Sequence, residues 1–467
     1  MLLRRLDNIG LTDDLYIRMN ARGKLLTQFE NFKAGLEKII LDNQWEEGHP
    51  HHNRFSFKID TKWTDYFWTN FKRDNSVDNS HIRFISTIAL YRIVIEKADE
   101  RLLTIPRLND DPSTVKPSYF SKDGFRYLYD CYEIYSNIES INDLKLDFPL
   151  WRHQPNGTFL SEIVFEDSHR TSYSLKILFY AQTEYLLRIK TFEINSFRDW
   201  MRVIRNIVSR GDVDKDGKRP DIIRSPQTFD GVINLINELA EGCSDIYSYL
   251  SELKNLKSTF AKEQIEEEKL KAKLIKKKPS LKELIWRAED NELLRGRIEF
   301  IFYCIDYYRE VDTFNEELFI NIQRIFETYF NNENEMPKDL RRAMLTIEVD
   351  GEYEFYNYWW SFWNAASATK RKLFVNYREI EYFIYSEYRE YFKKLIIKLT
   401  DKDFAHIISD FKPPKAMLNW KVRLIKEEIL LNQKSKSNYI AIPDDNSCCY
   451  LLKSKRPRDI DGGTLIQ

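Results

Sequence analysis

Glycine and proline are scarce in this chain. Fourteen of each occur among 467 residues, and together they make up about 6% of the chain, roughly half their usual share. This scarcity excludes collagen-like and low-complexity classes and disfavours a turn-rich β-sandwich. Cysteine is also rare, with five residues and no Cys-x-x-Cys pair. Neither a disulfide framework nor a thiolate zinc site is therefore expected.

An excess of charge of one sign is also missing. Lys and Arg number 72 and Asp and Glu number 73, so the formal net charge is −1. A polybasic nucleic-acid binder is thereby disfavoured, although a local basic patch stays open. The chain has no run of about 18 uncharged apolar residues, and its N-terminus lacks the apolar core of a signal peptide. We expect no membrane contact and a cytoplasmic location.

What the sequence does contain is typical of a well-packed, helix-rich protein: 43% hydrophobic, 14% aromatic and 31% charged residues. Thr27 and Glu30 fit a capping box, and apolar residues follow at helical spacing, so a helix is expected over about 28–41. Further helices are expected near 79–101, 172–190, 196–209, 228–241, 295–309 and 314–330. Only 55–59, where apolar and polar residues alternate, and 439–442 look extended.

The segment 258–278 is the clearest landmark of organisation. Its acidic residues precede lysines at helical spacing, as in Glu266 with Lys269 and Glu267 with Lys271, which predicts a long solvated helix. Pro279 would end this helix, and Ser280 with Glu283 offers a second capping box. The expected fold is mainly α and multi-helical, with few short strands and two helical regions joined near residue 279.

Four parts of the chain follow from this reading. They are a first segment, 1–45; a helical domain, 46–278, that ends in the long charged helix; a second helical region, 279–435; and a C-terminal tail, 436–467.

One N-terminal motif carries a family resemblance. The residues Tyr16, Asn20, Gly23, Leu26 and Glu30 match the pattern (F/Y)-x-x-x-N-x-x-G-x-x-L-x-x-x-E. This segment resembles the GmrSD-type restriction endonucleases of bacterial phage defence, whose N-terminal domain is similar to ParB and sulfiredoxin. Three later stretches resemble larger bacterial members of that family, in the same order along the chain: Trp200–Asn206, Glu263–Ala272 and Ala288–Ile298.

Two family motifs are missing. The nucleotide-handling domain of the family depends on an Asp-Gly-Gln-Gln-Arg motif well upstream of the Asn-x-x-Gly turn, and only 19 residues precede Asn20 here. The His-Asn-His nuclease domain of complete members is not recognisable either, since His406 is the only histidine after residue 169. The resemblance therefore implies the part of such a protein that follows the first half of its nucleotide domain, with 1–45 as the remnant of that domain.

The resemblance also implies a site. The turn around Asn20 would line a nucleotide pocket, with Gly23 allowing close backbone approach and the cations meeting phosphate. Its implied nucleotide- or phosphate-binding residues are Arg18, Asn20, Arg22, Gly23 and Lys24. NTP and Mg²⁺ are implied for the complete architecture, together with an upstream-encoded nucleotide-domain fragment as partner. The chain alone is expected to use no cofactor and to have no NTPase or nuclease activity; the alternative for the turn is that it only shapes the entry into the 28–41 helix.

Two basic clusters are candidates for DNA contact. They are Lys269, Lys271, Lys273, Lys276, Lys277 and Lys278 in the charged segment, and Lys370, Arg371 and Lys372 after an aromatic block at 353–363. The alternatives are a solvated helix face for the first cluster and core packing for the aromatic block.

Other motifs are weak. Asp212–Gly217 copies only half of a calcium loop, the histidines at 49–52 cannot easily converge on one ion, and Asp221 with Glu252 and Lys254 matches a nuclease pattern only as a string. No catalytic or metal site is expected. The leading hypothesis is a partial GmrSD-like phage-defence protein that recognises DNA or couples to a nucleotide domain; the alternative is a helical scaffold or protein-interaction module without enzymatic activity.

Overall fold

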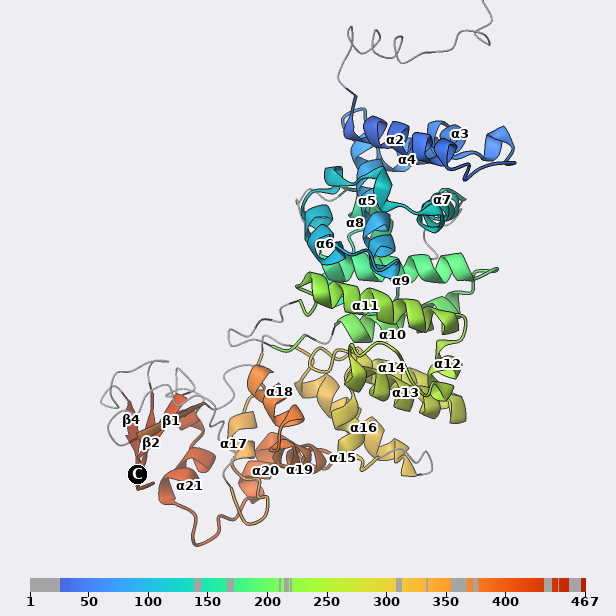
Figure 1. Cartoon of the computed structure of the whole chain (residues 1–467). Coiled ribbons are helices and arrows are strands. Elements are labelled where there is room, and N and C mark those ends of the chain that lie inside the picture. The colour runs from blue at the N-terminus through green and yellow to red at the C-terminus, as the bar shows by residue number, and fades with distance from the viewer. Residues whose placement is uncertain are drawn as a thin grey trace, which may run out of the picture.

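The computed structural model is mainly helical, with one small antiparallel sheet, which confirms the expected fold class (Figure 1). The structure describes residues 26–137, 144–165, 172–209, 211–213, 218, 221–307, 313–332, 335–353, 368–372, 377–431, 439–443, 445–452 and 463–467. Within these ranges, no helix is both long and apolar enough to cross a membrane.

Helices of the N-terminal half include those expected near 28–41, 172–190, 196–209 and 228–241, whereas the one expected near 79–101 ends at Ile95. Their bounds are α2 Gln28–Asp42, α3 Phe55–Asp60, α4 Lys62–Phe71, α5 Asp78–Ile95, α6 Arg101–Asp110, α7 Lys122–Asn137, α8 Phe159–Phe165, α9 Tyr173–Arg188, α10 Ile194–Val208, α11 Pro226–Leu239 and α12 Ile246–Glu252. The capping box at the start of α2 is formed: the Glu30 N–H donates to the Thr27 hydroxyl, and the Thr27 N–H donates to the Glu30 carboxylate.

The C-terminal half contains shorter helices and the sheet. The helices are α13 Lys262–Lys277, α14 Lys282–Glu289, α15 Glu299–Cys304, α16 Glu316–Tyr329, α17 Leu340–Met344, α18 Tyr377–Tyr385, α19 Arg389–Leu399, α20 Phe404–Asp410 and α21 Asn419–Lys426. The strands are β1 Ala368–Lys372, β2 Tyr439–Pro443, β3 Cys449–Leu451 and β4 Thr464–Ile466, paired antiparallel in the order β1-β2-β3-β4. The predicted extension at 439–442 is confirmed as β2, and part of the expected tail therefore belongs to a sheet.

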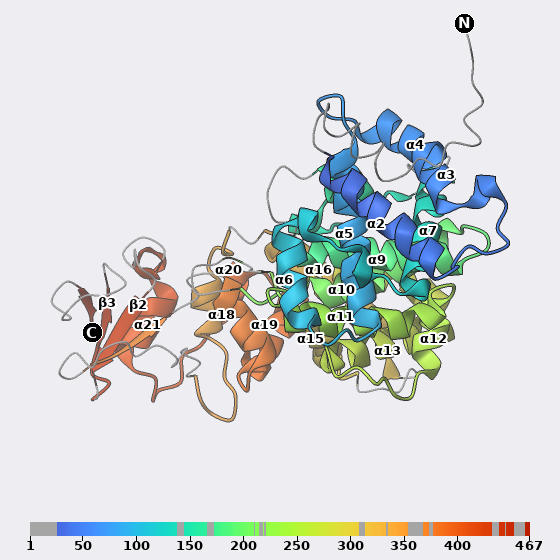
Figure 2. The ribbon, with the colours of Figure 1, turned by 45° about the horizontal axis from the view of Figure 1, so that its top comes forward.

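The core is organised around helices that are buried on all sides. Most of α5 and α9 is inaccessible to solvent, which is the pattern of a helix surrounded by others. Helix α2 packs on α5, and its Phe29 ring stacks on His81 with centroids 4.5 Å apart. Residues 28–42 thus share a core with the helices that follow them (Figure 2).

The prediction of an extended segment at 55–59 is wrong. Phe55 and Ile59 are fully buried, one helical turn apart, in α3, and Trp63 extends the same face into α4. A five-residue window fits both a period of 2 and a period of 3.6, and burial of the Phe55–Ile59–Trp63 face selects the helix. The two helices that follow in sequence, α3 and α4, pack on each other.

The charged segment differs from its prediction in one respect. Helix α13 ends before Pro279 as expected, and both predicted ion pairs form, Glu266 with Lys269 at 2.8 Å and Glu267 with Lys271 at 2.9 Å. One side of α13, however, is buried against α10 and α12. The helix is therefore amphipathic rather than solvated all round. The prediction of a second capping box at Ser280 and Glu283 is wrong, because α14 starts after a 3₁₀ turn over Pro279–Leu281 and has no side-chain cap.

Candidate functional site

The nucleotide-binding turn implied by the resemblance lies outside the described residues, as do most of the aromatic block, 354–363, and the side chains of Lys370, Arg371 and Lys372, whose backbone forms β1. Arg18, Asn20, Arg22, Gly23 and Lys24 accordingly stay a prediction. The site that the described residues build is centred on α13.

The three stretches singled out by the resemblance converge in space. Stretch 200–206 lies in α10, 263–272 in α13, and 288–298 covers the end of α14 and the turn after it. Their polar side chains form one buried ionic cluster, which consists of Arg202, Arg205, Asn206, Glu267, Glu268, Lys271, Glu289 and Asp290. This cluster crosses residue 279, so the two helical regions predicted on either side of that point are joined by a common polar core.

Lys271 is the central cation of the buried ionic cluster. Its Nζ atom lies 2.9 Å from Glu267, 2.8 Å from Glu268 and 3.1 Å from Glu289, and it donates to the backbone oxygen of Gly296 at 2.6 Å. Burial acts against the charge, but the three carboxylates outweigh it and raise the pKa of Lys271. Because the residue is 0% exposed, Lys271 is withdrawn from the predicted DNA contacts.

Glycine at position 296 makes this geometry possible. Its φ is +87°, a left-handed value, and a Cβ atom there would lie 2.9 Å from the backbone Cα of Asn206. Only glycine allows the turn to approach α10 so closely while its carbonyl faces Lys271.

Asn206 connects the acidic and basic halves of the buried ionic cluster. Its Oδ1 accepts from the Arg205 guanidinium at 2.9 and 3.1 Å, and its Nδ2 donates to Glu268 at 3.1 Å and to Glu289 at 2.9 Å. The amide oxygen thus faces the guanidinium and the amide nitrogen faces the carboxylates, which fixes the orientation of the side chain.

The buried ionic cluster carries one more carboxylate than cations. Its four acidic groups, Glu267, Glu268, Glu289 and Asp290, face three cations, Arg202, Arg205 and Lys271. Glu268 is the carboxylate with incomplete partners: its Oε2 atom is buried without a hydrogen bond in the described structure. Burial, aided by Glu289 and Glu267, raises the pKa of Glu268 from its ordinary 4.5 to about 7. At neutral pH this carboxyl group therefore takes up a proton readily.

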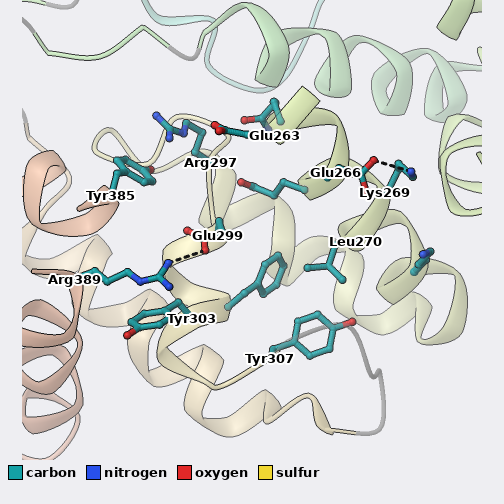
Figure 3. A pocket seen from close by; sticks show the side chains of 14 residues that line it. Glu263, Glu266, Lys269, Leu270, Arg297, Glu299, Tyr303, Tyr307, Tyr385 and Arg389 are labelled. Carbon is teal, nitrogen blue, oxygen red and sulfur yellow. Dashed lines mark hydrogen bonds and ion pairs between the residues drawn. The ribbon is translucent and has the colours of Figure 1, made fainter. Parts of the chain in front are cut away.

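A pocket adjoins the exposed side of α13. It has a volume of about 550 Å³ and lies between α13, α15 and the facing ends of α18 and α19 (Figure 3). Its lining residues include Lys269 and Lys273 of α13, Tyr303 of α15, Tyr385 of α18 and Arg389 of α19. Sequence reasoning found the two lysines and missed the other three, which have no shared motif.

Apart from Lys269, the remaining lysines of the predicted set lie at the C-terminal end of α13 or directly after it. Lys273, Lys276, Lys277 and Lys278 are exposed, whereas Lys269 is partly covered and paired with Glu266. Lys276 donates to the Ser248 hydroxyl at 2.7 Å, and Lys278 pairs with Glu316. Positive charge at this end also complements the helix macrodipole.

The weaker sequence motifs form no metal site in the described part of the chain, where no group of three or more His, Cys, Asp or Glu side chains could hold an ion. Asp212 pairs with Arg297 at 3.2 Å, and Asp221 accepts from the Ser172 hydroxyl at 2.9 Å. His153 is buried, and burial lowers its pKa to about 4.

Comparisons with protein-family models, with curated proteins and with solved structures each found no match. The family resemblance therefore rests on its sequence motifs.

Proposed function

We propose that this chain is a helical nucleic-acid-recognition module of a phage-defence protein similar to the GmrSD type. The observation that supports it is the exposed group formed by Lys273, Lys276, Lys277 and Lys278, which we call the lysine end of α13. These four cations lie within about 8 Å along the helix axis. DNA carries one negative charge per about 1.7 Å of its axis, so such a group can neutralise several phosphates at once.

The contacts of Lys276 and Lys278 leave room for a phosphate. Lys276 donates to the neutral hydroxyl of Ser248, and the carboxylate of Asp245 is reached only through that hydroxyl. Lys278 pairs with Glu316, but both side chains are about half exposed, and exposed pairs are typically worth about 1 kcal/mol or less. A phosphate can replace such a partner at little cost.

The proposal does not give the chain an active site of its own. NTP and Mg²⁺ would belong to the complete architecture, with the upstream-encoded nucleotide domain as partner, and DNA would be read in the cytoplasm. The chain alone is proposed to bind without hydrolysing.

Replacement of all four lysines of the lysine end by Ala tests the proposal. We expect affinity for a short DNA duplex at low salt to fall about tenfold or more, whatever its sequence, because phosphate contacts carry no base information. Fluorescence anisotropy with two duplexes of unrelated sequence measures this.

The matched control replaces three exposed lysines of the N-terminal half, Lys38, Lys116 and Lys122. This control changes the net charge by a similar amount but leaves α13 intact, so its affinity should stay close to that of the wild type. Equal losses in both variants, or no binding by the wild type, would refute the proposal.

A protein-interaction module is the second candidate, and exposed apolar side chains favour it. Leu41 is 77% and Leu103 is 75% exposed, so each offers apolar surface that a partner would cover. Co-purification of a protein partner that is lost on Leu103→Ser, with no DNA binding at low salt, would select this candidate.

A further inference from the structure

The pocket beside α13 has a size typical of small-ligand sites. Its volume of about 550 Å³ lies within the range of about 300–1,000 Å³ that such sites occupy. Side chains from four segments line it, and Figure 3 shows Arg389 and Glu299 facing each other on one wall, with α13 on the opposite side. The pocket thus presents charged groups from two directions.

Two arginines of this pocket lie over tyrosine rings. The Arg297 guanidinium carbon is 3.7 Å from the Tyr385 ring centroid, and that of Arg389 is 4.0 Å from the Tyr303 centroid. Such stacking holds each guanidinium in a fixed plane, and its N–H edge donates to a carboxylate, that of Arg297 to Asp212 at 3.2 Å and that of Arg389 to Glu299 at 3.5 Å. Flat guanidinium and phenol groups are the surfaces on which nucleobases stack.

Acidic groups also line the pocket: Glu263, Glu266 and Glu267 lie on the α13 side, and Glu299 lies beside Arg389. Glu299 is 3.5 Å from the Arg389 guanidinium, and burial together with Glu267 raises its pKa although Arg389 opposes the shift. A carboxylate in this position accepts hydrogen bonds from an exocyclic amino group, which is how acidic side chains distinguish cytosine.

Tyr307 supplies an independent observation. It lines the pocket and is 2% exposed, and its hydroxyl makes no hydrogen bond within the described residues. A buried hydroxyl without a partner costs about 1–3 kcal/mol. A polar ligand that reaches this hydroxyl would remove that cost.

We propose that this pocket binds a single nucleotide whose base carries an amino group. The base would stack against the arginine–tyrosine pairs with its amino group on Glu299, and the phosphate would face Lys273 across the pocket. The inference deepens the proposed function, on which it rests, by making the lysine end of α13 the phosphate track that leads to this pocket. The nucleotide comes from one of two sources, free in solution or turned out of a DNA strand.

Binding of mononucleotides to the full chain tests the pocket without DNA. CMP and UMP have nearly the same shape but present an amino group and a carbonyl at the same position. We expect titration calorimetry to show tighter binding of CMP, Glu299→Gln to bring the ratio of the two dissociation constants toward one, and Arg389→Ala to weaken both by about tenfold. Arg324→Ala, an exposed arginine of α16 away from the pocket, should change neither.

A single-stranded oligonucleotide with one 2-aminopurine tests whether the bound nucleotide is turned out of a DNA strand. If the nucleotide comes from a strand, the fluorescence of this base changes on binding, and Arg389→Ala abolishes the change while the lysine end still holds the strand. If the protein binds DNA but Arg389→Ala behaves like the wild type in both assays, nucleotide binding by the pocket is refuted and the proposed function still stands. No DNA binding by the wild type, or equal losses in the four-lysine variant and its control, together with tighter binding of CMP than of UMP, would do the reverse.

Discussion

Replacing Lys271 by Met is expected to lower the free energy of unfolding by about 3–5 kcal/mol, the usual cost of removing one partner from a buried ion pair. Methionine fills a similar volume, so packing is largely kept, but Glu267, Glu268 and Glu289 then lose their shared cation. Denaturant unfolding followed by tryptophan fluorescence measures the loss.

Lys273→Met is the matched control for this substitution. Lys273 lies two residues further along the same helix but is exposed, and a surface change of this kind usually alters stability by less than about 0.5 kcal/mol. Equal unfolding midpoints for the two variants would contradict the claim that Lys271 holds the buried ionic cluster together.

Glu268→Gln is expected to remove a pH dependence of stability. Because the pKa of Glu268 is raised to about 7 in the folded protein, the folded state binds more protons than the unfolded state between the two pKa values. The stability contribution is complete below the unfolded pKa of 4.5 and is lost as pH rises through about 7. The loss is on the order of 3 kcal/mol, and the glutamine variant, an isostere of the protonated acid, should lack it.

Unfolding curves at several pH values from about 4.5 to 8 test this, with the difference between variant and wild type as the readout. Glu266→Gln serves as control, since Glu266 lies on the same helix but is largely exposed. A wild type whose stability relative to Glu268→Gln does not fall with rising pH would show that Glu268 is ionised throughout.

Local features of the fold could be predicted from sequence. The capping box of Thr27 and Glu30 and the end of α13 before Pro279 depend on neighbours within one turn, and both are confirmed. The segment that starts at Phe55 was mispredicted because its short apolar pattern fits helix and strand alike, and only packing against other helices decides. The sheet depends on pairing between β1 and β2, about 70 residues apart, for which the sequence has no local signal.

Some contacts of the candidate site could likewise be predicted from the sequence, and others could not. The pair Glu267–Lys271 was predicted from its spacing, but spacing does not tell a buried pair from an exposed one, so Lys271 was grouped with Lys273. The arginine–tyrosine pairs join residues far apart in the chain, and no motif connects them. Resemblance did mark the three stretches that meet in the buried ionic cluster, though not that they touch.

The salt dependence of DNA binding tests the central claim most directly. If the lysine end of α13 neutralises four phosphates, the apparent association constant should fall with rising salt with a logarithmic slope of about −3 to −4 between about 25 and 200 mM. The four-alanine variant should show a slope near zero. A steep slope that persists in that variant, or no binding by the wild type at the lowest salt, would contradict the account.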